Sequence, residues 1–450
     1  MIRHIAPMDN FRPSDRPEMG EQTRADGVTS FRKNVGLASL GAMLEYYDFV
    51  VYIYVASKIG AAFFPPDASP GLRMIQTFAI YSIGFVIRPL AGIVIGHYSD
   101  RFGRKRWFVV TVVMMSVSTL MIGLLPTYGA IGWWAPLFLL LLRVLQGAAV
   151  GGELPSAAVF VAEHARAGRL GFAGAVLQSM AYGGFLLGAG SAMVADLIAG
   201  SVPDIPSLAW RLPFIAGGVF GLLSGYLRRA LEETPLFAEM NRRGDVAIAT
   251  PVRVVLLAHR RACLFGFGLI FVMTVTNVVY FQYWPALLET QMHVPHGQAI
   301  AISLTAIIAI MVAMPVWGWA YDRCGWAVTM AAGALALTVL SDWLFSSLSL
   351  LPPGSHVLYW AVVPVAVASG AVVAPVPGLL AAAFPTQVRQ TGYALPYNVG
   401  VALFGGPLPL MLVWLTSSNG IAGPLYVLLP ACVLALLLAY ATGGTKRYLG

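Results

Sequence analysis

The sequence predicts an all-α membrane protein with twelve transmembrane helices in two pseudo-symmetric six-helix halves. Hydrophobic residues make up 58% of the 450 residues, charged residues make up 11%, and the mean hydropathy is +0.75, which is far more apolar than a soluble domain. Apolar runs of about 20 residues, long enough to cross a hydrocarbon core, recur twelve times. A charged turn also occurs twice, nearly half a chain apart, as expected of two related halves.

The apolar runs define the expected spans, and a polar stretch between the sixth and seventh runs divides the chain. The spans are expected at residues 35–57, 73–97, 107–126, 133–161, 170–196, 209–230, 260–288, 298–320, 326–349, 356–383, 389–415 and 422–442. The expected units are a cytoplasmic N-terminal tail (1–33), an N-terminal six-helix half (34–230), a cytoplasmic linker (231–258), a C-terminal six-helix half (259–442) and a cytoplasmic C-terminal tail (443–450).

The basic residues orient these spans. With the N-terminus inside, 23 of the 28 Lys and Arg residues fall in cytoplasmic segments, three in outer loops and two within apolar runs. This bias predicts that both termini are cytoplasmic, and it makes a nucleic-acid partner unnecessary to explain the net charge of +8. Residues 1–30 hold no apolar run, so we expect a polar tail and not a cleaved signal.

Five ionisable residues lie deep within apolar runs, where charges are costly and usually functional: Glu45, Asp48, Arg88, Arg143 and Glu153. A rise of about 1.5 Å per residue places Asp48 about 22 Å from Lys33 and Arg143 about 14 Å from Trp134 on the opposite side. These depths predict that the acids of the first span and the arginine of the fourth meet near one level. We expect Asp48, Glu45 and Arg143 to couple protons, with structural ion pairs as the alternative.

Polar and aromatic residues recur at helical spacing and are expected to line a central path, although such stripes also serve as packing or interface belts. Gly147 with Gly151, and Gly184 with Gly188, have the spacing that favours close helix packing. Arg88 either binds an anion or braces the charged turn that follows. The candidate substrate-binding residues are Arg143, Arg88, Gln146, Glu153, Gln178, Tyr182, Asn277, Tyr280, Tyr393, Tyr397 and Asn398.

The repeated charged turn is a candidate cytoplasmic gate. The first copy runs from Gly96 to Lys105, and a reduced second copy runs from Gly318 to Gly325. An aspartate at the end of one helix can bind the N-terminus of a neighbouring helix or a basic side chain, and so hold two helix ends together. We expect this role for Asp100, with Asp322 as its weaker counterpart, because Trp326 and Ala327 replace the basic pair that follows in the first copy.

Several further motifs occur in order along the chain: Glu45-Tyr46-Tyr47-Asp48-Phe49, Arg88-Pro89-Leu90-Ala91-Gly92, Arg143-Val144-Leu145-Gln146-Gly147, Gly151-Gly152-Glu153, Glu163 with Arg169, residues 231–237, residues 384–392 and Gly405-Gly406-Pro407. From about residue 34 to 442 the chain resembles the major facilitator superfamily and, within it, the metabolite:proton symporter family.

The resemblance implies the major facilitator fold, with two halves that rock about a central site and uptake driven by the proton gradient. In related sugar porters a helix 1 aspartate faces a helix 4 arginine as the proton switch, and Asp48 and Arg143 match those positions. Tyr46 departs from the usual Trp, and the coiled coil of the family's osmolyte carriers is lacking. The full set of expected gate residues is Gly96, Asp100, Arg101, Gly103, Arg104, Glu163, Arg169, Asp322, Arg323 and Arg389.

Because of the arginines within the spans, the first expected function is proton-coupled uptake of a small organic anion, a carboxylate metabolite. We expect the protein to lie in a bacterial inner membrane. A carrier of a zwitterion such as proline or betaine and a proton-antiport exporter are the alternatives. An intramembrane enzyme is disfavoured, because no nucleophile lies beside a base and no metal ligands cluster; Cys263, Cys324 and Cys432 are scattered. We expect no cofactor beyond the proton gradient, no nucleic acid, and a functional monomer in the lipid bilayer.

Overall fold

The computed structural model describes residues 21–165, 168–201, 208–228, 251–348, 350–352 and 355–443. Residues 1–20, positions 231–250 of the expected linker and all but the first residue of the expected C-terminal tail lie outside this part of the chain, as does the motif at 231–237. The structure therefore does not test the prediction for the first 20 residues, for the middle of the linker or for the chain beyond residue 443.

The N-terminal half is built from long apolar helices joined by short turns. Its elements are α1 (Glu21–Tyr54), α2 (Ala56–Phe63), α3 (Pro70–Phe102), α4 (Arg104–Leu124), α5 (Tyr128–Ile131), α6 (Trp134–His164), α7 (Leu170–Ser201) and α8 (Leu208–Arg228). The start of α3 follows a standard signal, because Ser69 accepts a hydrogen bond from the Leu72 N–H and Pro70 occupies the first turn. The α1 helix begins at Glu21, inside the expected tail 1–33.

The C-terminal half repeats this plan with more interruptions. Its elements are α10 (Pro251–Ala258), α11 (Arg260–Asn277), the π-helix η2 (Val278–Tyr283), α12 (Trp284–Met292), α13 (His296–Cys324), α14 (Trp326–Leu348), α15 (Val357–Val373), α16 (Val376–Ala382), the 3₁₀ turn η3 (Thr386–Val388), α17 (Arg389–Gly400), the π-helix η4 (Val401–Gly405), α18 (Leu408–Asn419), the 3₁₀ turn η5 (Gly420–Ala422) and α19 (Leu425–Gly443). The α10 helix occupies the last residues of the expected linker.

The expected twelve-span fold is confirmed. Nine helical segments of the described residues are long and apolar enough to cross a membrane, and they coincide with expected spans two to five and seven to eleven. The remaining three spans are α1, α8 and α19. The seventh and eleventh spans are not uniform α-helices, because η2 and η4 interrupt them.

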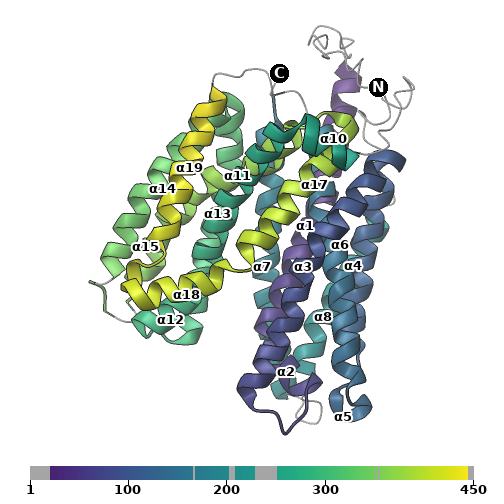
Figure 1. Ribbon diagram of the computed structural model, residues 1–450, viewed down its shortest axis with the longest axis vertical. Helices are drawn as coiled ribbons and strands as arrows, with labels where there is room; N and C mark the ends of the chain where they lie inside the picture. Colours follow the sequence, from purple (N-terminus) through teal and green to yellow (C-terminus); the bar gives the residue numbers. More distant parts are fainter. Residues whose placement is uncertain are drawn as a thin grey trace.

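The two halves meet at one end of the bundle and diverge toward the other. In Figure 1 the halves are joined at the end where α10 and the start of α17 lie, whereas α2 and α5 lie well apart from α12 and α18 at the opposite end. Between the halves, α13 packs on α7, and α17 packs on α3 and α6. We call the joined end, which holds Asp100, Asp322 and Arg389, the closed end, and the opposite end the far end.

Glycines allow the helices of the N-terminal half to pack closely. A Cβ atom on Gly147 would lie 2.5 Å from the Gly84 carbonyl oxygen, and one on Gly184 would lie 2.1 Å from the Met43 oxygen. Their partners in the predicted motifs, Gly151 and Gly188, face the same neighbouring helices, α3 and α1. The small-residue motifs therefore serve helix packing, as expected.

Candidate functional site

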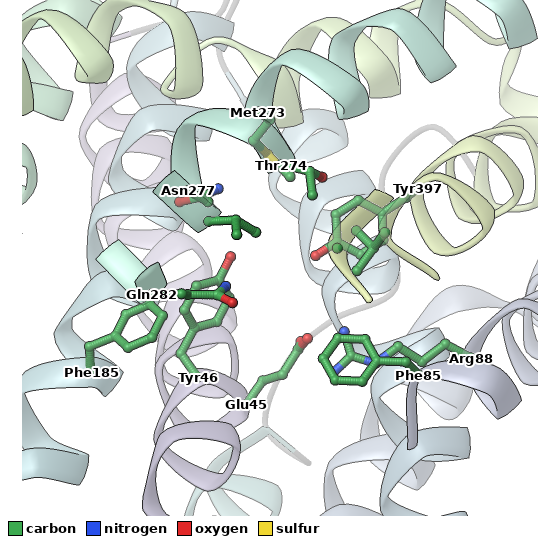
Figure 2. Close-up of a pocket in the computed structure, with 13 residues that line it drawn as sticks. Glu45, Tyr46, Phe85, Arg88, Phe185, Met273, Thr274, Asn277, Gln282 and Tyr397 are labelled. Carbon is green, nitrogen blue, oxygen red and sulfur yellow. The ribbon is translucent and has the colours of Figure 1, made fainter. Parts of the chain in front are cut away.

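A central cavity lies between the two halves. It encloses about 620 Å³ of space between the protein atoms, including its opening. Side chains from α1, α3 and α7 of one half face those of α11, η2, α17 and η4 of the other (Figure 2). The lining residues are Glu45, Tyr46, Phe85, Arg88, Phe185, Met273, Thr274, Asn277, Val278, Gln282, Tyr397, Val401 and Gly405. Four of them, Glu45, Arg88, Asn277 and Tyr397, are among the residues expected from the sequence.

Glu45 brings a carboxylate to the wall of this cavity. Its side chain is only 4% exposed, and its Oε2 atom has no hydrogen-bond partner. Figure 2 shows the carboxyl group pointing toward the centre of the cavity, on the side where Phe85 and Arg88 lie. A buried acceptor without a partner is costly, so this atom marks a place where a ligand group or a water molecule would be stabilised.

Aromatic rings surround Glu45. Tyr46 and Phe185 meet edge to face with their centroids 5.2 Å apart, and the Arg88 guanidinium lies 4.7 Å from the centroid of Phe85. Tyr397 completes the aromatic lining from the other half of the molecule. The cavity therefore combines apolar ring surfaces with one acidic and one basic side chain.

Three of the expected substrate-binding residues lie behind the cavity wall and not on it. Gln178 donates a hydrogen bond of 3.3 Å to the Tyr46 hydroxyl, and the Tyr182 ring lies 6.0 Å from that of Tyr46. Tyr393 packs at 5.8 Å against Tyr397. None of the three lines the cavity, so in this structure they support the rings that do.

Tyr280, expected to face the central path, does not line the cavity in this structure. Its hydroxyl lies 2.6 Å from the Ser341 Oγ atom, and its ring packs near Trp284 and Phe345 inside the C-terminal half. The cause is the π-helix η2, whose wider turn closes hydrogen bonds from i to i+5. After Asn277 the next cavity-lining polar residue is Gln282, five positions on, and not the residue three positions on that an α-helix would present.

In the eleventh span the cavity-lining residues are four positions apart. Tyr397, Val401 and Gly405 line the cavity across η4, whereas the Phe404 ring packs on Phe271 with a centroid distance of 4.9 Å. Asn398, expected to bind substrate, instead donates hydrogen bonds to the Gly151 carbonyl of α6 (2.7 Å) and the Ala394 carbonyl (3.0 Å). It joins the two halves and does not line the cavity.

Glu153 also lies away from the cavity. It is fully buried and accepts a hydrogen bond of 2.7 Å from the Thr111 hydroxyl of α4. This contact lies within the N-terminal half, and Glu153, expected to bind substrate, does not line the cavity in this structure. Arg88, by contrast, reaches the cavity.

A second hollow, which we call the side chamber, lies within the N-terminal half beside the central cavity. Its lining shares Glu45, Phe85 and Arg88 with the cavity and adds Asp48, Tyr81, Gly84, Met115, Arg143, Gln146, Gly147 and Val150. The residues expected to couple protons are thus gathered around one chamber, and Glu45 faces both hollows.

Asp48 and Arg143 are connected through two intervening side chains and not by a direct ion pair. Arg143 Nη1 donates to Gln146 Oε1 (2.7 Å), and Gln146 Nε2 donates to Thr119 Oγ1 (2.7 Å). Thr119 Oγ1 in turn donates to Asp48 Oδ2 (2.5 Å). The sequence placed Asp48 and Arg143 at one level but did not identify Thr119, because a threonine in an apolar span carries no functional signal.

Two aromatic rings hold the Arg143 guanidinium. Its central carbon lies 4.3 Å from the centroid of Tyr52 and 5.1 Å from that of Tyr81. Guanidinium groups are stabilised over ring faces, the more so when water is excluded. This arrangement explains how Arg143, which is 5% exposed, is retained without direct contact with a carboxylate.

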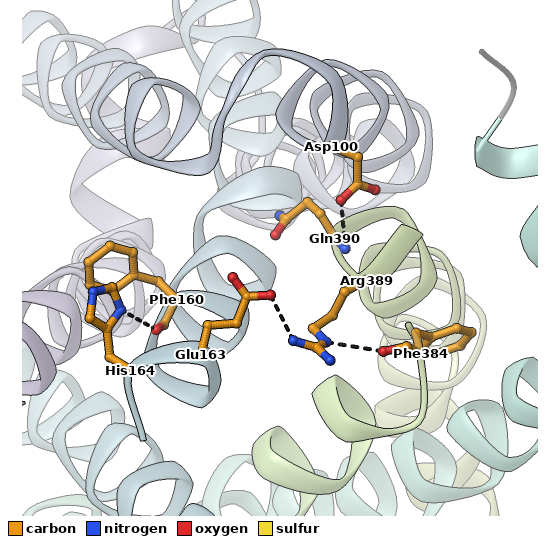
Figure 3. A network of polar contacts seen from close by, with 7 residues as sticks. All are labelled: Asp100, Phe160, Glu163, His164, Phe384, Arg389 and Gln390. Carbon is orange, nitrogen blue, oxygen red and sulfur yellow. Dashed lines mark hydrogen bonds and ion pairs between the residues drawn. The ribbon is translucent and has the colours of Figure 1, made fainter. Parts of the chain in front are cut away.

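At the closed end, Asp100 binds the first turn of α17 in the other half. Its Oδ1 accepts from the Gln390 N–H (3.1 Å) and its Oδ2 accepts from the Thr391 N–H (2.9 Å). Figure 3 shows the carboxylate directed at this turn. The unpaired N–H groups of a helix N-terminus attract negative charge, so the contact has the geometry that the sequence led us to expect.

Asp322 makes the equivalent contact in the opposite direction. Its two carboxylate oxygens accept from the N–H groups of Gly171 (2.7 Å) and Phe172 (2.9 Å) at the start of α7. Both charged turns end in a glycine with positive φ, 103° at Gly103 and 84° at Gly325, a conformation that glycine adopts at little cost. The second copy therefore keeps the backbone geometry of the first.

An ion pair strengthens the closed end. Arg389 Nη1 lies 2.8 Å from Glu163 Oε1, and its Nε donates to the Phe384 carbonyl at 3.1 Å (Figure 3). Nearby, Gln390 Nε2 donates to the Ser156 hydroxyl at 2.9 Å. These contacts join α6 to α17 and so connect the two halves.

The remaining expected gate residues differ in what they contact. Gly96 lies against α17, where a Cβ atom would come within 3.1 Å of the Thr391 Cα. Arg101 lies over the Phe102 ring and Arg323 over the Trp319 ring. Arg169 is exposed near the start of α7, and the Arg104 side chain lies outside the described part of the structure.

Comparison with known proteins agrees with this architecture. The family profile described as Major Facilitator Superfamily matches residues 38–406. Among solved structures, the proton:xylose symporter XylE superposes with a TM-score of 0.74 at 17% identity, covering 93% of this chain and 96% of that one. The transporter FucP in its outward conformation superposes with a TM-score of 0.68 at 15% identity, covering 92% and 100%.

Closer relatives in sequence are bacterial carriers. The chain is 34% identical over 415 residues to the glycine betaine/proline/ectoine/pipecolic acid transporter OusA of Dickeya dadantii (strain 3937), covering 90% of this chain and 82% of that protein. It is also 34% identical over 425 residues to the proline/betaine transporter of Escherichia coli (strain K12), covering 92% and 83%. Both are named as transporters, and together with the family match they make this chain a transporter and not an intramembrane enzyme. The chain belongs to the major facilitator superfamily and is a multi-pass membrane transporter of small molecules.

Proposed function

We propose that this transporter takes up a small zwitterion, of the class that includes proline and glycine betaine, together with protons. The observation that carries the proposal is that Glu45 and Arg88 line one aromatic cavity. A zwitterion offers one group of each charge to such a site. The named substrates of the relatives favour this alternative over the organic anion that the sequence analysis placed first.

The cationic end of the substrate fits the Glu45 side of the cavity. Glu45 Oε2 lacks a partner, and the rings of Tyr46, Phe185 and Phe85 lie around it. Ring faces together with a carboxylate recognise quaternary and secondary ammonium groups. A purely anionic substrate would instead be repelled by a carboxylate at this position, in a region where water screens little.

The carboxylate end of the substrate fits Arg88 together with the polar groups that the C-terminal half brings to the cavity. Arg88 offers a guanidinium, which binds carboxylates with directed hydrogen bonds, and Thr274, Asn277 and Gln282 add neutral donors from the C-terminal half. A ligand that spans these groups would contact both halves at once. Binding would then be linked to the relative position of the halves, as alternating access requires.

The orientation of the described state supports uptake as the direction of transport. Basic residues concentrate in the segments at the closed end and in the two tails, which favours placing that end in the cytoplasm. The halves diverge at the far end (Figure 1), which would then face the outside. In a bacterial inner membrane the described state would load substrate from outside, and protonation at Asp48 would couple uptake to the proton gradient.

Uptake into proteoliposomes tests the substrate class. With an inward proton gradient, labelled glycine betaine or proline should accumulate, unlabelled zwitterions should compete, and succinate or lactate should not. Choline, which keeps the cation but lacks the carboxylate, should compete weakly. Accumulation of carboxylates without zwitterions would contradict the proposal, and a gradient-driven loss of preloaded substrate would instead support an antiport exporter.

A further inference from the structure

We infer that Thr119 and Gln146 are positioning residues that transmit the protonation state of Asp48 to Arg143. The inference rests on the proposed proton coupling and adds the path by which the coupling reaches the arginine. It is carried by three consecutive hydrogen bonds among buried groups on α1, α4 and α6. We call these side chains, Asp48, Thr119, Gln146 and Arg143, the relay.

The Thr119 hydroxyl is the element of the relay that can switch. It has one hydrogen and two acceptor sites, and two acceptors lie within its reach, Asp48 Oδ2 at 2.5 Å and the Met115 carbonyl at 2.9 Å. When Asp48 is ionised, the hydroxyl donates to the carboxylate. When Asp48 carries a proton, its own O–H donates to Thr119, and the threonine hydrogen turns to Met115.

Gln146 carries this change to the arginine. Its amide donates to Thr119 through Nε2 and accepts from Arg143 through Oε1, so both ends of one rigid amide plane are engaged. Loss of negative charge at Asp48 weakens the other hydrogen bonds of the relay, because hydrogen bonds in series polarise and so reinforce one another. Arg143, whose Nε lacks a partner, is then less firmly held beside Asp48.

The surroundings of Asp48 contain few other charges that could take over this task. On α6 the charged residue that shares the side chamber with Asp48 is Arg143. On α3 the titratable residues that line the chamber are Arg88 and Tyr81. Glu45 lies one turn away on α1 itself. From α8 the contact is Gly217, where a Cβ atom would lie 3.0 Å from Asp48 Oδ1.

The other helices packed on α1 present no charge to Asp48 within their described residues. On α4 the neighbour is Thr119 itself. On α7 the acidic residue Asp196 pairs with Lys58. On α8 the arginine Arg211 is bound to the carbonyls of Gly123 and Leu125. The relay is thus the hydrogen-bonded connection between Asp48 and the buried arginine.

Substitution of the threonine tests the relay in proteoliposomes. Thr119→Val keeps the shape of the side chain and removes the hydroxyl, whereas Thr119→Ser keeps the hydroxyl. Loss of a hydrogen bond to a charged group should move the outside pH for half-maximal gradient-driven uptake upward by about one unit, because the carboxylate loses the donor that stabilises its ionised form. Thr119→Ser should restore the wild-type profile.

Two controls separate a coupling role from a structural one. Ser118→Ala removes a neighbouring buried hydroxyl of α4 that donates to the Met114 carbonyl of its own helix, and it should leave the pH profile unchanged. Substrate counterflow at equal pH, which needs no net proton release, should fall much less in Thr119→Val than gradient-driven uptake does. A shift confined to the gradient-driven pH profile supports the relay.

The possible failures are distinguishable. If wild-type protein shows no response of zwitterion uptake to the proton gradient, the proposed function is wrong. If wild-type uptake is coupled and the Thr119→Val profile superimposes on it, the relay is contradicted. If Thr119→Val does not fold, Gln146→Met carries the same test, and an unchanged pH profile in that variant overturns the inference.

Discussion

Asp100 and Asp322 make the same contact from opposite halves of the molecule. Each carboxylate accepts hydrogen bonds from two backbone N–H groups in the first turn of a helix in the other half. That helix is α17 for Asp100 and α7 for Asp322. The two contacts hold the closed end together in a nearly two-fold manner. Both must break for the halves to separate there, so the structure predicts a matched pair of effects.

Asp100→Asn should destabilise the closed end without altering the cavity. The amide keeps one acceptor but loses the charge that favours the α17 N-terminus, a loss of up to about 2 kcal/mol. The population of the described state should fall by about 5- to 30-fold relative to the alternative state. Net uptake should slow while the substrate affinity, measured by binding at equilibrium, changes little. A large affinity defect with normal turnover would contradict this role.

Asp322→Asn provides the matched comparison. Because Asp322 makes two hydrogen bonds to α7 of similar length to those at Asp100, its substitution should slow net uptake by a comparable factor. The double variant should be slower than either single variant. If Asp322→Asn behaves as wild type, the second charged turn only fixes topology and does not hold the closed end.

Asp48→Asn should separate exchange from accumulation. Asparagine keeps a hydrogen-bond partner for Thr119 but cannot gain or lose a proton, so accumulation driven by the proton gradient should be lost. Exchange of labelled for unlabelled substrate should persist, because it requires only that the loaded carrier reorients. Both rates are measured in the same proteoliposomes, and unchanged gradient-driven uptake would remove Asp48 from the mechanism.

Glu45→Gln should weaken recognition of the cationic end of the substrate. Loss of a charge-assisted contact of about 1.5–3 kcal/mol should raise the dissociation constant of glycine betaine by about 10- to 100-fold. Binding of succinate should not weaken in this variant. A variant that keeps wild-type affinity for glycine betaine would contradict the zwitterion orientation proposed for the cavity.

The π-helix η2 makes a further prediction, because it decides which polar residue faces the cavity. Gln282→Leu should raise the apparent KM for the substrate, since Gln282 lines the cavity. Tyr280→Phe should leave the KM unchanged, because the Tyr280 hydroxyl bonds to Ser341 away from the cavity. The opposite result would indicate that this span turns as a regular α-helix in the working protein.

Close helix packing predicts a stability difference between two glycines of α7. Gly184→Ala would place a methyl group 2.1 Å from the Met43 oxygen of α1, and such overpacking costs about 1–3 kcal/mol. Gly190→Ala has nothing within 4 Å of the new atom. The thermal midpoint of the purified protein should fall for the first and not for the second, and equal midpoints would contradict the close approach of α1 and α7.

Much of the fold follows from the sequence because apolar runs and basic residues report directly on the bilayer. The contact of Asp100 with a neighbouring helix N-terminus was also predictable, since an aspartate beside glycines at a helix end has few other roles. The lining of the cavity was predicted less well. Tyr280 was assigned by α-helical spacing, and the π-helix η2 that changes this spacing has no clear sequence signal.

The partners of the buried charged residues were also difficult to predict from the sequence. Helical rise placed Asp48 and Arg143 at one depth, and the structure gathers both around the side chamber. Their connection through Thr119 was not predictable, because hydroxyls on apolar helices commonly bond to their own backbone, as Ser118 does. Likewise Glu153 and Asn398 looked like substrate ligands, yet they bond to α4 and α6, since a polar residue in a span signals a partner without naming it.

The proton flux that accompanies substrate entry tests the central proposal most directly. Proteoliposomes containing a trapped pH indicator and no initial pH gradient would receive glycine betaine outside, with the membrane potential held inside-negative. The lumen of wild-type vesicles should acidify on substrate addition, whereas Asp48→Asn vesicles should take up substrate down its concentration gradient without acidification. A lumen that stays neutral or turns alkaline in wild-type vesicles while substrate enters would contradict the proposal.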